Sequence, residues 1–172
     1  LVDQVGSDVT RFVMLTRKND APLDFDFDKV LEQSRDNPVY YVQYASARIH
    51  SVFRKADEAG ITFDKKQAMN ERFETVTHEA EIKIAKKLAE WPRLVEIAAK
   101  TNEPHRIAFY LYELAGDFHS LWNKGNEISE LRFIQEDNHR ASCIKMAMIS
   151  AVLVVISSGL DILGVEPATH MN

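Results

Sequence analysis

Asn37-Pro38-Val39-Tyr40-Tyr41-Val42-Gln43-Tyr44-Ala45-Ser46-Ala47-Arg48 is the stretch that decides how this chain folds. Asn37 is a preferred N-cap, and Pro38 suits the first helical position because its φ is already helical and its missing N–H would have no partner there. Apolar residues then recur at helical spacing, which predicts one buried face. These residues are Val42, Ala45, Ile49, Val52, Phe53 and Ala56. Gly60 is a typical left-handed stop, so we expect one helix over residues 38–59.

Tyr41, Tyr44 and Arg48 lie on a second face of the same predicted helix, at spacings of three and four. Tyrosine rings and a guanidinium plane on one rigid face are suited to stacking unpaired RNA bases and holding the phosphates between them. Tyrosines at this spacing also form the polar edge of a helical core, and spacing alone favours that alternative. The two interpretations predict different surroundings for these side chains.

The rest of the chain is predicted as helices joined by short loops. Ser7 is expected to cap a first helix to about residue 17, and Asp26 or Asp28 a short helix to about residue 33. Residues 23–28 alternate apolar and acidic side chains, as in a short strand or an extended connector. Trp91-Pro92 is expected to stop or bend a helix. Further helices are expected over residues 65–73, 77–91, 92–100, 102–123 and 135–163, the last with a break near 157–159. The predicted fold is an all-α helical bundle of five or six helices.

Composition fits one globular domain. The chain has 172 residues, 45% of them hydrophobic, with five prolines and six glycines. Residues 1–11 carry no secretory signal pattern, and the apolar stretch over residues 146–156 is short of the roughly 20 residues that a membrane crossing needs. The single Cys143 excludes an intramolecular disulfide and a multi-cysteine zinc site, and it is expected in the core. We therefore expect a cytoplasmic protein.

The net charge of −5 argues against a nucleic-acid binder that relies on a broad basic surface. It is compatible with recognition at a small patch, where a few bases are splayed out and stacked. Arg48, Arg54 and Lys55 could supply such a patch from the first long helix. A lysine cluster over residues 83–87 is surrounded by glutamates and is predicted to be a solvated face.

Metal and nucleophilic catalysis are not supported. A carboxylate-bridged metal site in a bundle needs Glu-x-x-His on two helices, and Glu136 with His139 is a single copy. His78 lacks the second histidine of a zinc-protease motif, because Ile82 occupies that position. Cys143 has only His139 one turn away and no oxyanion-stabilising group nearby. We therefore predict no metal site and no catalytic residue.

Several short motifs follow one another along the chain. They lie at residues 5–12, 103–105, 110–111, 114–119, 159–165 and 171. Together with residues 37–48, these motifs resemble bacterial arginyl-tRNA synthetases, a class I aminoacyl-tRNA synthetase family. Residues 37–48 are similar to the Asn-Pro-x-Tyr-Tyr-x-Gln-Tyr-Ala-His-Ala-Arg segment that opens the anticodon-binding domain of these enzymes. Ser46 departs from the family histidine, and the last helix keeps the Leu- and Arg-rich family pattern only loosely.

The resemblance implies a domain organisation and a set of binding residues. Residues 1–34 would be the end of the catalytic region with its connecting segment, and residues 35–172 the α-helical, DALR-type anticodon-binding domain. Tyr41, Tyr44, Arg48, Tyr110 and Met171 stand where related enzymes hold the tRNA anticodon loop. Without the resemblance, Tyr110 would be assigned to core packing and Met171 to a frayed terminus. We expect Tyr41, Tyr44, Tyr110 and Met171 to line one solvent-open concavity.

The resemblance also implies what this chain would need from elsewhere. Class I synthetases bind ATP, with Mg²⁺, through His-Ile-Gly-His-type and Lys-Met-Ser-Lys-type motifs, and neither these nor a glycine-rich phosphate loop occurs here. The chain would thus be the C-terminal part of an arginine–tRNA ligase, inactive in aminoacylation by itself and without a cofactor of its own. Its partners would be arginine tRNA and the catalytic domain of the same polypeptide, with no membrane partner, and we expect a monomer. The alternative, from a different class, is an all-α protein–protein interaction module without RNA binding, which the acidic balance favours.

Overall fold

The computed structural model describes residues 2–18, 26–64, 66 and 76–171. Within these ranges the chain forms seven α-helices, one 3-10 helix and no strand, so the predicted all-α fold is confirmed. The elements are α1 (Val2–Val5), α2 (Ser7–Leu15), α3 (Phe27–Leu31), α4 (Pro38–Glu58), α6 (Glu79–Thr101), α7 (His105–Glu127), η1 (Ser129–Leu131) and α8 (His139–Leu163). The helix predicted over residues 65–73, and most of the strand or connector predicted over residues 23–28, lie outside the described residues.

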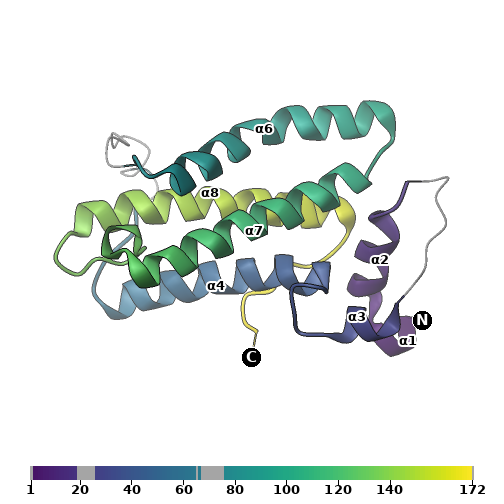
Figure 1. Ribbon diagram of the computed structural model, residues 1–172, viewed down its shortest axis with the longest axis horizontal. Helices are drawn as coiled ribbons and strands as arrows, with labels where there is room; N and C mark the ends of the chain where they lie inside the picture. Colours follow the sequence, from purple (N-terminus) through teal and green to yellow (C-terminus); the bar gives the residue numbers. More distant parts are fainter. Residues whose placement is uncertain (1, 19–25, 65, 67–75, 172) are drawn as a thin grey trace.

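The four long helices form the bundle, and the short N-terminal helices cover one end of it (Figure 1). α7 and α8 pack against each other and against both α4 and α6, so they make up the middle of the bundle. α2 packs against α4, α7 and α8 at the covered end. Phe12 from α2, Phe118 from α7 and Ile149 from α8 are fully buried between these helices.

The predicted start and stop signals act where they were expected in α3, α4 and α8. The Asn37 side chain accepts the Tyr40 N–H at 3.1 Å and donates to the Val30 carbonyl at 2.7 Å. It therefore caps α4 and also fixes the loop that leads from α3. Asp26 caps α3, and Gly164 ends α8 with φ 67°.

Three predicted helix boundaries are wrong. α6 continues through Pro92 to its end at Thr101. Pro92 is exposed, so water can reach the carbonyl that loses its N–H partner. Asn102, expected to start the next helix, instead ends α6 in the left-handed conformation with φ 53°. α8 begins at His139 and is continuous across residues 157–159. The glycine in that segment serves close packing, since a Cβ on Gly159 would stand 2.6 Å from a methyl carbon of Leu111.

The predicted start of the first helix differs as well. Two helices are observed, and Gly6, with φ 88°, precedes α2. Ser7 lies inside α2 instead of capping it. Cys143, expected in the core, is only partly buried, with its Sγ 3.8 Å from the Thr62 carbonyl oxygen.

The buried side of α6 is mostly apolar, with Ile84 and Ala98 buried and Leu88, Trp91 and Leu94 packed against the core. Ile82 is 37% exposed, whereas Glu81 and Ile84 are buried against the neighbouring helices. Glu81 pairs with Lys145 of α8, and the two side chains are 1% and 6% exposed. Because an unpaired charge in the core is costly, the pair joins Glu81 of α6 to α8, on the same side as the apolar residues of α6 that reach the core.

α8 is the one described helix that is long and apolar enough, by length and composition, to cross a membrane. Half of its most apolar window is buried inside the bundle. Its buried residues come from several sides, including Ile144, Ile149, Val152 and Leu160. A central core helix of a bundle has this same composition.

The segment after α8 turns back and runs along α4 (Figure 1). Val165 is buried, and the Gln43 side chain donates to the Glu166 carbonyl at 2.9 Å. Further along, Arg54 donates to the Thr169 carbonyl at 3.3 Å. The chain terminus is therefore tied to α4 as far as the described residues reach.

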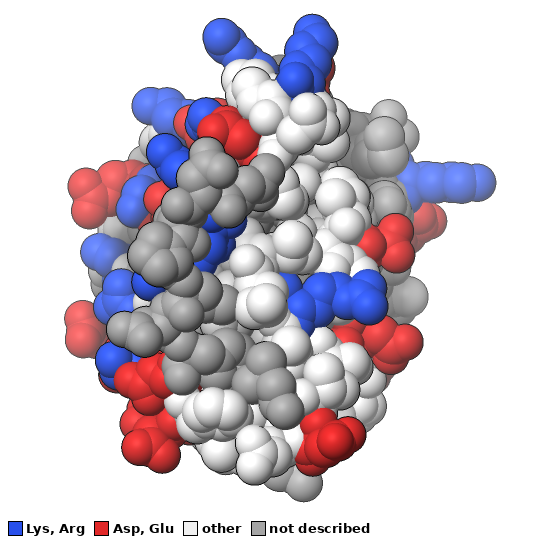
Figure 2. Space-filling view, turned by 90° about the vertical axis from the view of Figure 1, so that its right-hand side faces the viewer, with Lys and Arg blue, Asp and Glu red and all other residues white. Residues whose placement is uncertain are grey.

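The end of the molecule that carries the N-terminal helices is weakly charged at its centre. Figure 2 shows this end, where a band of uncharged side chains runs through the face, interrupted by a basic side chain, and most of the other charged side chains stand toward the margin. Val2, Met14, Phe27 and Leu31, from α1, α2 and α3, are 42–59% exposed. Four large apolar side chains on three short neighbouring helices form a surface that differs from the charged flanks of the bundle.

Candidate nucleic-acid interface

Arg48 lies at the centre of a cluster of flat side chains from α4 and α7. Its guanidinium carbon is 4.3 Å from the ring centroid of Tyr44 and 4.9 Å from that of Trp122. Its NH1 nitrogen lies 3.3 Å from Nδ1 of His119. The Tyr44 ring in turn stacks on the His119 ring, with centroids 5.5 Å apart. Cation–π attraction and the contact with His119 together fix the guanidinium plane between two rings.

This cluster arises because α4 and α7 run side by side in the same direction (Figure 1). Arg48 follows Tyr44 by one turn on α4, and Trp122 follows His119 by nearly one turn on α7. Each helix carries a small, fully buried side chain, Ala45 on α4 and Ala115 on α7. The rings of these residues and the guanidinium of Arg48 therefore form a stacked row along the edge where α4 and α7 meet, and we refer to this row, made up of Tyr44, Arg48, His119 and Trp122, as the ladder.

A pocket of about 290 Å³ opens beside the ladder. It is lined by Tyr44, Ala47, Arg48, Ser51, Arg54, Lys55, Trp122, His170 and Met171. The tied C-terminal segment supplies one wall, which explains how a near-terminal methionine reaches a site built on α4. We refer to this hollow as the Arg48 pocket.

The charge of the Arg48 pocket is opposite to that of the whole chain. Arg48, Arg54 and Lys55 line it, and the lining contains no aspartate or glutamate from the described part of the chain. The chain as a whole carries a net charge of −5. Anions such as phosphates are therefore favoured locally, in a site that also offers ring faces for stacking.

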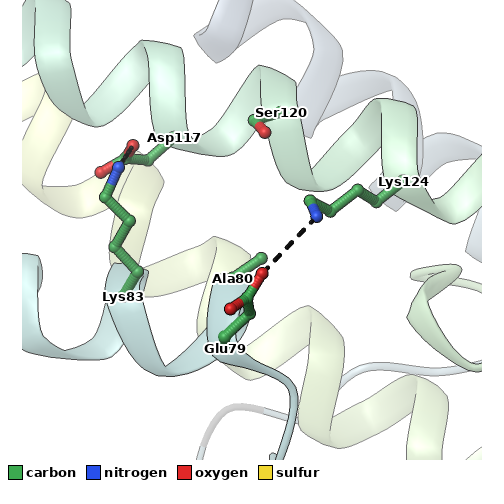
Figure 3. A pocket seen from close by; sticks show the side chains of 6 residues that line it. All are labelled: Glu79, Ala80, Lys83, Asp117, Ser120 and Lys124. Atoms are coloured by element: carbon green, nitrogen blue, oxygen red, sulfur yellow. Dashed lines mark hydrogen bonds and ion pairs between the residues drawn. The ribbon is translucent and has the colours of Figure 1, made fainter.

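Another hollow, between α6 and α7, shows the contrast (Figure 3). Lys83 points to Asp117 across it, with 2.6 Å between Nζ and Oδ1. Lys124 faces Glu79 at 3.9 Å. Both lysines in this hollow are matched by carboxylates, so it has no net attraction for an anion. No group of three or more metal-ligating side chains occurs in the described part of the chain.

Tyr41 lies next to the Arg48 pocket but does not line it, so the expectation that it shares one concavity with Tyr44 and Met171 is wrong. Its ring is 4.5 Å from the His119 ring and 5.3 Å from the Tyr112 ring. Burial raises the pKa of the Tyr41 phenol, so it stays neutral at physiological pH. Tyr41 is half-buried and supports His119 from the side opposite Arg48.

Tyr110 lies apart from the other predicted residues. It faces α6, where its ring is 5.3 Å from that of Trp91 and its hydroxyl donates to the Lys87 carbonyl at 2.5 Å. Only 4% of it is exposed, and burial raises its pKa. The expectation that Tyr110 shares a concavity with Tyr44 and Met171 is therefore wrong. The reason is that positions 110 and 118 to 122 of one helix face different neighbours.

Three residues of the site escaped the sequence analysis: His119, Trp122 and His170. Trp122 is half-buried: it packs partly against the core and presents a ring face to Arg48. The aromatic cluster Phe118-His119-x-x-Trp122 was a usable signal, since a buried histidine among rings needs polar partners. His170 carried no signal, because its place depends on the tertiary path of the C-terminal segment.

Comparison with known proteins places these features in a family. Residues 42–171 match the model of the DALR anticodon binding domain, which is most of the chain. The chain belongs to the DALR anticodon-binding domain family. The match includes Tyr44, Arg48, Trp122 and Met171 of the Arg48 pocket, and it begins one residue after Tyr41.

Relatives of this DALR domain are longer proteins. The chain is 68% identical over 172 residues to an arginine–tRNA ligase of Ruegeria pomeroyi and 61% identical over 172 residues to one of Roseobacter denitrificans. In each case it spans all of this chain and 30% of the relative. A crystal structure from Campylobacter jejuni, described as an arginyl-tRNA synthetase, matches with a TM-score of 0.82 at 26% identity, over 99% of this chain and 34% of that one. The Thermus thermophilus arginyl-tRNA synthetase shares the fold, with a TM-score of 0.67 at 22% identity, over 98% of this chain and 27% of that one.

Proposed function

We propose that this chain is the anticodon-binding part of an arginyl-tRNA synthetase and that it grips the anticodon loop of arginine tRNA in the Arg48 pocket. The observation that carries the proposal is the pocket itself, where the described lining brings together three cations and two aromatic rings and includes no carboxylate side chain. Membership of the DALR family and similarity to arginine–tRNA ligases support the choice of RNA. The intact cytoplasmic enzyme would attach arginine to the tRNA with ATP, using residues outside this chain.

In the proposed binding mode the aromatic rings contact a base and the cations contact phosphates. The guanidinium of Arg48 lies between the Tyr44 and Trp122 rings, so an extruded base would contact the parts of these rings that face the pocket, together with Met171. A stacked base typically contributes ~1–3 kcal/mol. Arg54 and Lys55, which are exposed at the mouth, would contact phosphates on either side of that base. Tyr41 would act indirectly, by supporting the ladder, and Tyr110 would stabilise the packing of α7 on α6 without touching RNA.

A small cationic patch on an acidic protein predicts a modest salt dependence. Three phosphate contacts to single-stranded RNA give a slope of about −2 in a plot of log affinity against log salt concentration. A protein that binds through a broad basic surface would show a much steeper slope. The slope therefore separates the Arg48 pocket from non-specific attraction.

The exposed apolar residues of α1, α2 and α3 have a role in the same proposal. The relatives are more than three times as long as this chain, and their remaining parts need an attachment surface. We infer that the uncharged end formed by these helices packs against the catalytic part (Figure 2). Residues 1–34 would then belong to the junction and residues 35–172 to the RNA-binding bundle.

The test is a titration of this chain with arginine tRNA and with the same tRNA altered at the middle anticodon base. We expect tighter binding of the unaltered tRNA. Arg48→Ala should weaken binding by about tenfold or more, because charge-assisted contacts contribute ~1.5–3 kcal/mol. Arg93→Ala, which removes the same charge from an exposed position on α6, is the matched control and should bind as the parent does. Equal binding of the two tRNAs would rule out recognition of the anticodon, and no binding at low salt would rule out the proposal in favour of the protein–protein interaction module.

A further inference from the structure

His119 is a buried residue whose two ring nitrogens both have partners in the site. Its Nδ1 lies 3.3 Å from NH1 of Arg48, and its Nε2 lies 3.1 Å from the carbonyl oxygen of Tyr41. Only 4% of the residue is exposed. The ring is also held by Tyr41 and Tyr44, at centroid distances of 4.5 Å and 5.5 Å.

The two partners determine which nitrogen carries the proton. A guanidinium can only donate hydrogen bonds, and a carbonyl oxygen can only accept them. Nε2 must therefore carry the hydrogen that it donates to Tyr41, and Nδ1 must offer its lone pair to Arg48. The neutral Nε2–H tautomer is the one form of His119 that satisfies both contacts.

Arg48 gains a fixed orientation from this arrangement. A free arginine side chain loses up to ~2 kcal/mol of rotamer entropy when it is immobilised, and that loss would otherwise weaken RNA binding. Here one end of the guanidinium is hydrogen-bonded to His119, and its plane is fixed by Tyr44 and Trp122. Among the described residues no carboxylate pairs with Arg48, so its charge and its other N–H groups are available to a ligand.

We propose that His119 is a positioning residue, which accepts a hydrogen bond from Arg48 and so holds the guanidinium ready for RNA in the Arg48 pocket. This inference rests on the proposed function, but its first consequence concerns the free protein. Burial, and to a smaller extent the charge of Arg48, lower the pKa of His119 to about 4, while the Tyr41 carbonyl opposes this shift. His119 is thus the neutral acceptor throughout the physiological range.

Two substitutions separate positioning from simple packing. His119→Phe keeps a ring of similar shape but removes the acceptor for Arg48. His119→Asn loses most of the ring but places an amide oxygen near the position of Nδ1. A residue that only fills space would tolerate phenylalanine better, whereas a residue that positions Arg48 would tolerate asparagine better. The two roles therefore predict opposite orders.

The fluorescence emission of Trp122 reports on the position of Arg48 in the free protein. Trp91→Phe leaves Trp122 as the single tryptophan, because the chain contains two. In this background we expect His119→Phe to change the Trp122 emission, since the guanidinium leaves the ring, and His119→Asn to leave it close to the parent value. Unchanged emission in His119→Phe would overturn the inference.

Binding of arginine tRNA is the second readout. We expect His119→Phe to bind about tenfold more weakly than the parent, the equivalent of ~1.4 kcal/mol, and His119→Asn to bind within about threefold of it. Circular dichroism verifies that both variants are folded at the assay temperature. Tighter binding by His119→Phe than by His119→Asn would refute the positioning role. Failure of the parent chain itself to bind tRNA would overturn the proposed function, and the emission of Trp122 would tell the two failures apart.

Discussion

The buried ion pair between Glu81 and Lys145 makes the most quantitative prediction about stability. It joins α6 to α8, and the two side chains are 1% and 6% exposed. Lys145→Met keeps the shape of the side chain but leaves the Glu81 carboxylate inside the bundle without its partner. Removal of one member of a buried pair typically costs ~3–5 kcal/mol. A domain has ~5–15 kcal/mol of unfolding free energy in total, so this loss is a large share of it.

The assay is denaturant and thermal unfolding followed by circular dichroism, arranged as a double-mutant cycle. For a domain of this size the predicted loss lowers the Tm by roughly 6–20 °C. The double variant Glu81→Leu with Lys145→Met removes both charges and should be about as stable as the parent, or up to ~4 kcal/mol more stable. Strong coupling between the two sites is therefore expected.

Lys83→Met, on the same helix as Glu81, is the matched control. Lys83 also forms an ion pair with a carboxylate of α7, but its side chain is 68% exposed. An exposed pair contributes only ~0–1 kcal/mol, so this variant should barely change the Tm. If Lys145→Met were as harmless as Lys83→Met, the idea that Lys145 compensates the buried charge of Glu81 would be refuted.

Three further predictions concern the core. The pKa of His119 is lowered from 6.5 to about 4 on folding, so the unfolded chain binds more protons between these values. Acidification over this range should therefore reduce the unfolding free energy, by up to ~3 kcal/mol, and His119→Phe should lack this component in pH-dependent urea unfolding. Ser46 is fully buried, and no described residue bonds to its hydroxyl, so Ser46→Ala should raise the unfolding free energy by ~1 kcal/mol; a lower Tm would reveal a partner for that hydroxyl. Gly159→Ala would push a Cβ to 2.6 Å from Leu111 and should cost ~1–3 kcal/mol, whereas an unchanged calorimetric Tm would contradict the close packing of α7 on α8.

Local sequence signals predicted where helices start and end better than they predicted which residues are exposed. Asn37 and Pro38 start α4, and Gly164 ends α8, because caps act through hydrogen bonds to residues a few positions away. Pro92 does not end α6, as its sequence position had suggested. Its effect depends on whether the carbonyl that loses its N–H partner is exposed to water or buried in the core. Exposure is a tertiary property, so no local pattern could supply it.

Which face of a helix is buried could not be predicted from the sequence, for the same reason. On α6, Ile82 is exposed, whereas the charged Glu81 is buried with Lys145 as its partner. That partner lies 64 residues away along the chain. A buried charge of this kind can be recognised only when the helix that carries its partner is in place.

The candidate site was predicted in part. Tyr44 and Arg48 lie on one helix at a spacing of four, so their proximity followed from helix geometry. Tyr110 was assigned to the same concavity through resemblance, yet it faces α6. Trp122 and His119 join the site only because α4 and α7 run in parallel, which is a contact between distant segments.

The location of bound RNA tests the central claim most directly. The two tryptophans, Trp122 beside Arg48 and Trp91 against Tyr110, are built-in reporters for the two sides of α7. Their indole N–H signals can be followed by NMR in the ¹⁵N-labelled chain as the anticodon stem-loop of arginine tRNA is added. We predict that the Trp122 signal shifts and the Trp91 signal does not. A shift of Trp91 with Trp122 unmoved would show that RNA binds elsewhere on the bundle and would contradict the account.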